Sequence, residues 1–154
     1  TDAGRGWSVD PGVTATLEMA AAYTGHYGAS LRASSGTATL IFRPYITQTV
    51  SIPSTWSQPT LSFMYRTIQG AAGDALVATV SGDSAVITHS VPLTASDWTH
   101  AWRDLSAFSG QTVTLKFGLS YESSSQHVYL DEISVGDTEA GSYGIYLPLV
   151  LRNR

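Results

Sequence analysis

Apolar and polar residues alternate with a period of two along much of the chain. In one segment Leu61, Phe63 and Tyr65 fall on the same face of an extended strand. A second segment carries its apolar residues in the same way, at Val113, Leu115, Phe117 and Leu119. This pattern is typical of an antiparallel strand with one buried face and one solvated face. We therefore predict that these seven side chains are mostly buried in one core.

Similar short segments recur between Gly-, Ser- and Asp-rich turns. We predict further strands over residues 15–19, 29–33, 38–46, 49–52, 75–80, 85–93, 98–105 and 127–135. About ten short strands at this spacing predict a sandwich or a barrel. We expect an all-β fold, an antiparallel two-sheet jelly-roll-like sandwich. Residues 17–23 also fit a short helical turn, which is too brief to change the fold class.

The pattern changes after Gly136, and we divide the chain there. Residues 1–136 are expected to form the β-sandwich domain, 137–144 a linker, and 145–154 an apolar C-terminal tail segment. Exposing the tail to water would be unfavourable, by about 25 cal/mol per Å² of apolar surface. We expect it to dock as an extended edge segment on its own domain, through Ile145, Leu147 and Leu149. The alternative is self-association or anchoring to a partner through this tail.

Composition excludes several classes of function. The 154 residues carry a net charge of −4, with one Lys and seven Arg and no basic cluster, which argues against a nucleic-acid partner. Without Cys, disulfides and Cys-ligated metals are excluded. No apolar run approaches the ~20 residues that span a membrane. Because Ser, Thr and Gly fill most polar positions, we expect an extracellular or cell-surface location.

Three segments resemble a known group of domains, in the right order. They are Gln48–Pro53 with Pro59–Arg66, then Trp98–Phe117, then Val128–Val135. Together they resemble the accessory jelly-roll modules of secreted bacterial hydrolases and peptidases, which are galactose-binding-like or carbohydrate-binding-module-like sandwiches. The resemblance covers about residues 6–136. It implies a non-catalytic carbohydrate-binding domain of a secreted or surface protein. Because this superfamily also contains protein-contact and spacer domains, the alternative is a structural or protein-contact domain without glycan binding.

The adjacent carboxylates Asp131 and Glu132 interrupt the last predicted strand. Apolar positions shift by one residue across this pair, which predicts a β-bulge or a twist. If Asp131 is buried, it needs a partner. In the resembled modules the corresponding Asp often helps to bind a structural calcium ion. The resemblance implies that Asp2 and carbonyls of the 24–26 turn would complete the site. Alternatively, Asp131 accepts hydrogen bonds from backbone N–H groups or pairs with an Arg.

Candidate ligand-binding residues surround Trp102. If Leu105 faces the core, Trp102 and His100 face outward, and aromatic rings beside polar groups are typical of sugar-binding surfaces. For Trp98 we favour packing. Arg43, Arg66 and Lys116 could supply further hydrogen-bond donors. Trp56 and Tyr121 are rival aromatic platforms.

The sequence gives no support for an enzyme. Its four His are scattered, and neither a His-Glu-x-x-His motif nor a Gly-x-Ser-x-Gly elbow is present. Asp131 and Glu132 would point to opposite faces of a strand, unlike the two carboxylates of a glycosidase. We therefore expect a binding or contact domain without catalysis. Solvent exposure of Trp102, Trp56 or Tyr121 beside polar groups distinguishes glycan binding from the structural alternative.

Overall fold

A computed structural model describes residues 6–9, 14–33, 45–120, 125–138, 143–146 and 151–153. Within these segments the regular structure consists of β-strands and two 3₁₀ turns, without an α-helix. The first elements are β1 (Trp7–Val9), β2 (Thr14–Glu18), η1 (Met19–Ala21), β3 (Gly28–Ala33), β4 (Tyr45–Ser51) and β5 (Pro59–Gln69). Then come β6 (Ala75–Ser81), β7 (Val86–Pro92), β8 (Thr99–Asp104), η2 (Ser106–Phe108), β9 (Thr112–Ser120), β10 (Gln126–Asp137), β11 (Tyr143–Tyr146) and β12 (Leu151–Asn153).

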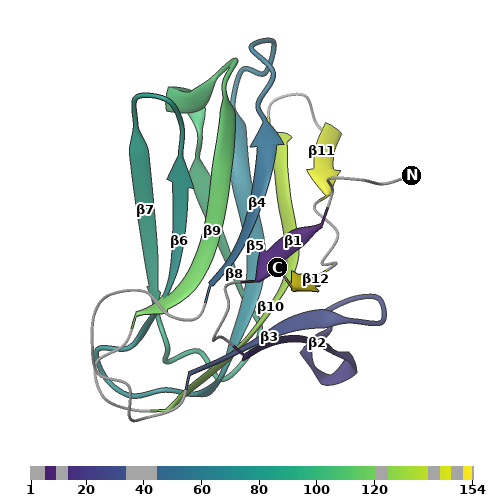
Figure 1. Cartoon of the computed structure of the whole chain (residues 1–154), viewed down its shortest axis with the longest axis vertical. Helices are drawn as coiled ribbons and strands as arrows, with labels where there is room; N and C mark the ends of the chain where they lie inside the picture. The colour runs from purple at the N-terminus through teal and green to yellow at the C-terminus, as the bar shows by residue number, and fades with distance from the viewer. Residues whose placement is uncertain are drawn as a thin grey trace.

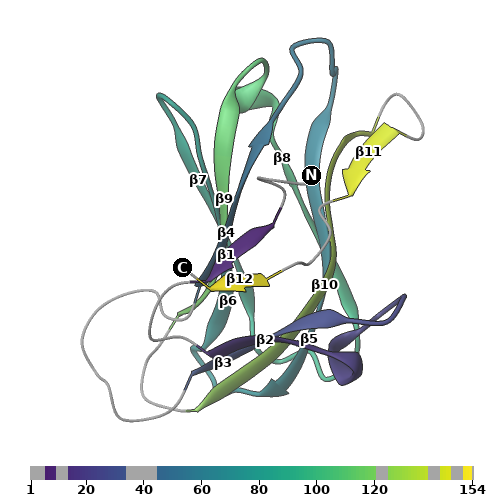
Figure 2. The same cartoon turned by 45° about the vertical axis from the view of Figure 1, so that its right-hand side comes forward.

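The strands form two sheets that face each other as a jelly-roll sandwich (Figures 1 and 2). The first sheet has the order β12-β1-β4-β9-β6-β7. The second has the order β2-β3-β10-β5-β8, and β11 pairs with the end of β10. All of these pairings are antiparallel except the one between β1 and β12. The predicted fold class is therefore confirmed.

The core lies between the two sheets and contains the predicted apolar residues. All seven predicted positions on β5 and β9 are at most 6% exposed. Phe117 contacts Trp7 and Phe63, with ring centroids 5.6 and 5.0 Å apart respectively. The alternation therefore identified the inward faces correctly. When one face of a sheet is buried, the apolar residues of each strand must all point to that face.

One predicted strand break is absent from the structure. The sequence predicted separate strands over 38–46 and 49–52, which is wrong, because β4 runs without interruption from Tyr45 to Ser51. Thr47 and Gln48 stay in the strand since they pair in register with β9, opposite Lys116 and Leu115. Residues 38–44 lie outside the described part of the chain. The expected helical turn is present as η1.

Two parts of the tail pair with strands of the same chain. In β11, Ile145 lies opposite Val135 of β10, and in β12, Leu151 lies opposite Trp7 of β1. These pairings agree with the expected intramolecular docking. Leu147 and Leu149 lie outside the described residues, so their predicted contact stays a prediction, as does the division at residue 136.

None of the described helical segments has the length and apolar character needed to cross a membrane.

Candidate functional site

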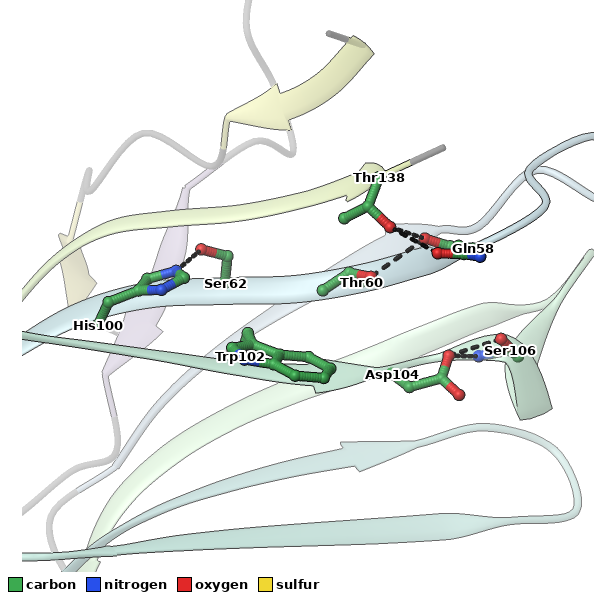
Figure 3. Close-up of a pocket in the computed structure, with 8 residues that line it drawn as sticks. All are labelled: Gln58, Thr60, Ser62, His100, Trp102, Asp104, Ser106 and Thr138. Atoms are coloured by element: carbon green, nitrogen blue, oxygen red, sulfur yellow. Dashed lines mark hydrogen bonds between the residues drawn. The ribbon is translucent and has the colours of Figure 1, made fainter. Parts of the chain in front are cut away.

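A groove of about 730 Å³ opens on the outer face of the second sheet (Figure 3). Its floor is formed by β5 and the edge strand β8, and its ends by side chains from adjoining turns. The lining is almost wholly polar and surrounds one indole ring: Gln58, Thr60, Ser62, His100, Trp102, Asp104, Ser106 and Thr138. An apolar ring among hydroxyl, amide, imidazole and carboxylate groups makes this groove the candidate site.

Strand register brings these side chains together. Ser62 pairs with Trp102 and Thr60 with Asp104, so the two pairs lie side by side on one face. Leu61 and Leu105 turn to the opposite face, where both are buried. Because successive residues of a strand alternate between faces, burial of the leucines directs the polar residues and Trp102 outward.

Trp102 is the exposed aromatic ring of the groove. Its side chain is 61% exposed on a strand at the edge of the sheet. His100 lies on the same face, and its Nε2 is 2.7 Å from the hydroxyl oxygen of Ser62 (Figure 3). The predicted outward orientation of both residues is confirmed. The flat indole can stack on a sugar ring, and the imidazole beside it can bind the hydroxyl groups of that sugar.

Asp104 places a negative charge at one end of the groove. Its Oδ1 accepts hydrogen bonds from the backbone N–H and the hydroxyl of Ser106, at 2.9 and 2.5 Å. These bonds lower the pKa of Asp104, and the nearby positive charge of Arg103 lowers it further. Asp104 is thus ionised at neutral pH and acts as a hydrogen-bond acceptor.

The opposite wall of the groove depends on the end of β10. The carboxylate of Asp137 accepts hydrogen bonds from the backbone N–H groups of Ser57 and Gln58, at 3.0 and 2.9 Å. Thr138 then donates its hydroxyl to Gln58, with distances of 3.3 Å to the carbonyl oxygen and 3.2 Å to Oε1. Asp137 is only 7% exposed. A buried carboxylate therefore fixes the turn that carries Gln58 into the groove.

The other predicted ligand-binding residues lie elsewhere. Arg66 is on the same strand as Ser62, but its Nε donates to the carbonyl of Ser96 at 2.9 Å and it does not line the groove. Trp56 is partly buried and packs against the core, which weakens it as a platform. Lys116 is on the other sheet, 3.8 Å from the centre of the Tyr45 ring. Arg43 and Tyr121 lie outside the described residues.

The acidic pair lies at the predicted β-bulge. The register between β10 and β5 shifts after Asp131, and Glu132 adopts a positive φ of 48°. Asp131 is 7% exposed, and its Oδ2 accepts hydrogen bonds from the backbone N–H groups of Tyr23 and Thr24. These contacts correspond to the alternative that we considered for Asp131. Calcium binding at this residue stays a prediction, since the described residues contain no cluster of three metal-ligating side chains and Asp2 lies outside them.

Trp98 makes an aromatic contact instead of lining the groove. Its ring centroid is 5.4 Å from that of Tyr23, at an interplanar angle of 58°. Trp98 is half-buried, which agrees with the packing that we favoured.

Several lining residues were missed by sequence reasoning. Thr60 and Ser62 alternate with the apolar residues of β5 that were predicted to be buried, so the pattern already placed them on the outer face. Asp104 shares its phase with Trp102 in the same way. Gln58, Ser106 and Thr138 come from turns, where alternation gives no information.

The fold is similar to solved structures of carbohydrate-binding modules. The CBM22-1 xylan-binding domain from Paenibacillus barcinonensis Xyn10C aligns with a TM-score of 0.58 and 16% identity, over 84% of each chain. The family 16 carbohydrate-binding module-2 aligns with a TM-score of 0.57 and 19% identity, over 82% of this chain and 87% of that one. The structure of TmCBM61 in complex with β-1,4-galactotriose aligns with a TM-score of 0.50 and 14% identity, over 81% of this chain and 86% of that one.

At these identities the similarity establishes the jelly-roll fold and leaves the function to be argued from the site. No family model and no curated protein sequence matches the chain.

Proposed function

We propose that this chain is a non-catalytic carbohydrate-binding domain of a secreted or cell-surface protein. The observation that carries the proposal is the exposed indole of Trp102, set in a groove of polar side chains. An exposed aromatic ring with polar groups converging around it is the usual composition of a small-ligand site, in which the ring supplies apolar contact and the polar groups fix orientation. The hydroxyl, amide and carboxylate groups around Trp102 match the hydroxyl groups that border the apolar face of a sugar ring.

The similar structures support the same class of ligand. Two of the aligned modules have described glycan ligands, xylan for one and β-1,4-galactotriose for the other. We therefore propose a linear polysaccharide of neutral sugars as the ligand class. The polar lining favours glycan binding over the structural or protein-contact alternative, because Asp and Ser side chains are depleted in protein-contact surfaces.

Binding of xylan, β-1,4-galactan and mixed-linkage β-glucan to the isolated chain tests the proposal. We expect retardation in affinity gels containing at least one of these polymers, followed by a measurable dissociation constant by calorimetry. Trp102→Ala should weaken that affinity by about 30-fold or more, as expected for the central aromatic anchor of a binding surface.

The matched control is Tyr27→Ala, because Tyr27 is 56% exposed and does not line the groove. This variant should bind like the wild type. If no polymer binds, or if Trp102→Ala binds as tightly as the wild type, glycan binding in this groove is wrong.

A further inference from the structure

The acidic pair of β10 anchors a distant connection of the chain. The Oδ2 of Asp131 accepts the backbone N–H of Tyr23 at 2.7 Å and that of Thr24 at 3.2 Å. The hydroxyl of Thr24 donates to Oε1 of Glu132 at 2.5 Å. Three hydrogen bonds to two carboxylates therefore hold the connection between β2 and β3 against the bulge. Bonds of this kind, with a charged acceptor, are stronger than those between neutral groups.

This connection lies directly on the outer face of the second sheet. Asp131 pairs with Met64 of β5, which has the same phase as the groove residue Ser62, so Asp131 faces outward. Gly28 has no side chain where η1 crosses it, and a Cβ there would be 1.8 Å from the carbonyl oxygen of Ala21. The absence of a side chain at Gly28 allows the connection to pack on the sheet surface.

The anchored connection places Tyr23 against Trp98 on the side of β8. Asp131 is on β10 and Trp98 immediately precedes β8, while β5 lies between these two strands. The ring contact of Tyr23 with Trp98 therefore spans the outer face above β5. Tyr23 remains 45% exposed in this contact, so the pair presents aromatic surface to solvent.

The aromatic pair and the groove lie on one continuous face. Trp98 precedes Trp102 by four residues, a distance of about 13 Å along an extended strand. His100, exposed and on the same face as Trp102, lies midway between them. Two aromatic contacts separated by a hydrogen-bonding group suit an extended ligand that follows β8. A ligand that stacks on a single ring would need only Trp102.

We infer that Tyr23 and Trp98 form a second sugar-contacting subsite, which extends the groove at Trp102 and which the acidic pair holds in position. The inference rests on the proposed glycan-binding function. It identifies the ligand as an extended chain that reaches from Trp102 past His100 to the aromatic pair. Asp131 is then a positioning residue, because it acts on the ligand only through Tyr23.

The length of the ligand provides the test. Xylo-oligosaccharides and β-1,4-galacto-oligosaccharides, from the disaccharide to the hexasaccharide, are titrated into wild-type protein by calorimetry. We expect affinity to rise with length until both subsites are filled. Tyr23→Ala should weaken the longer oligosaccharides by about three- to tenfold, the range of one aromatic contact, and leave the shortest binding ones unchanged.

Asp131→Asn should reproduce the effect of Tyr23→Ala in its length dependence, since it weakens the bonds that place Tyr23. Tyr27→Ala, a change to another exposed ring of the same connection, is the control and should bind all lengths like the wild type. Thermal melts of each variant identify any that fail to fold, and Tyr23→Phe, which keeps the ring, should retain long-chain affinity.

Two results overturn the inference in different ways. If oligosaccharides bind through Trp102 but Tyr23→Ala weakens all lengths equally or none, the aromatic pair is not a second subsite. If no oligosaccharide of either series binds and Trp102→Ala changes nothing, the proposed function itself fails.

Discussion

Phe63 of β5 and Phe117 of β9 join the two sheets through an edge-to-face contact. Their ring centroids are 5.0 Å apart, the rings are inclined by 82°, and both side chains are fully buried. Trp7 also contacts Phe117, at a centroid distance of 5.6 Å. The two strands are far apart in sequence, so this contact fixes the sandwich and, with it, the outer face that carries the groove.

Replacing Phe117 with Ala should lower the free energy of unfolding by about 3–5 kcal/mol, because it leaves a cavity between the sheets. Chemical denaturation measures this loss. Val86→Ala is the control, since Val86 is 65% exposed on the edge strand β7 and its loss creates no cavity. A Phe117→Ala variant as stable as the wild type would contradict the core position of this ring.

A calcium ion at Asp131 would stabilise the folded chain by mass action. Both hydrogen bonds from the 23–24 backbone end on Oδ2, so they do not in themselves prevent a metal from binding this carboxylate. If calcium binds, EDTA should lower the melting temperature of the wild type, and Asp131→Ala should abolish that sensitivity. A wild-type melt that EDTA leaves unchanged would mean that Asp131 serves only to anchor the backbone.

Stability should decrease as the solution becomes mildly acidic, because of two histidines. Burial lowers the pKa of His89, with help from Arg103, and burial likewise lowers the pKa of His127, with help from Arg32. In the unfolded chain both return to an ordinary pKa of about 6.5. As the pH falls through that value, the unfolded state binds protons first, so unfolding becomes easier.

We therefore expect the melting temperature to fall between about pH 7.5 and pH 5.5, where these histidines titrate in the unfolded chain. The double variant His89→Gln/His127→Gln should show a smaller decrease over the same interval. His100→Gln is the matched control, because His100 is exposed on the sheet surface. Equal pH dependence in the double variant and the wild type would assign the effect to other groups.

The charge of Asp104 should make the groove discriminate against acidic sugars. Two like charges about 5 Å apart in a water-like medium weaken binding by about fourfold. Uronate-substituted xylo-oligosaccharides should therefore bind more weakly than unsubstituted ones of equal length. Asp104→Asn should remove this difference, and added salt should reduce it in the wild type. Equal binding of both ligands by the wild type at low salt would contradict the prediction.

Removing residues 144–154 should destabilise the domain. The deletion takes away the partners of β10 residues from Ser134 to Gly136 and of β1 from Trp7 to Val9, and exposes both edges. We expect a lower melting temperature and more aggregation, measured by calorimetry and light scattering. If the shortened chain is equally stable and monomeric while the full chain associates, the tail is an interaction or anchoring element.

The alternation of residues determined the fold class and the direction of the side chains on the strands that form the groove. Leu61 and Phe63 specified the inward phase of β5, which directs Ser62 outward, and the same reasoning placed His100 and Trp102 outward on β8. Period-two patterns carry this information because burial of one face fixes the direction of every side chain in the strand. The phase shift at Asp131 likewise predicted the bulge that the structure contains.

Other features were decided only by the tertiary structure. Alternation does not state which strands are neighbours, so the pairing of Ser62 with Trp102 and the contribution of Thr138 to the groove could not be read from it. The partner of Asp131 was also undetermined, because a buried carboxylate is satisfied equally well by a cation or by N–H groups. Its partners are separated from it by more than a hundred residues, and only folding brings Tyr23 to it.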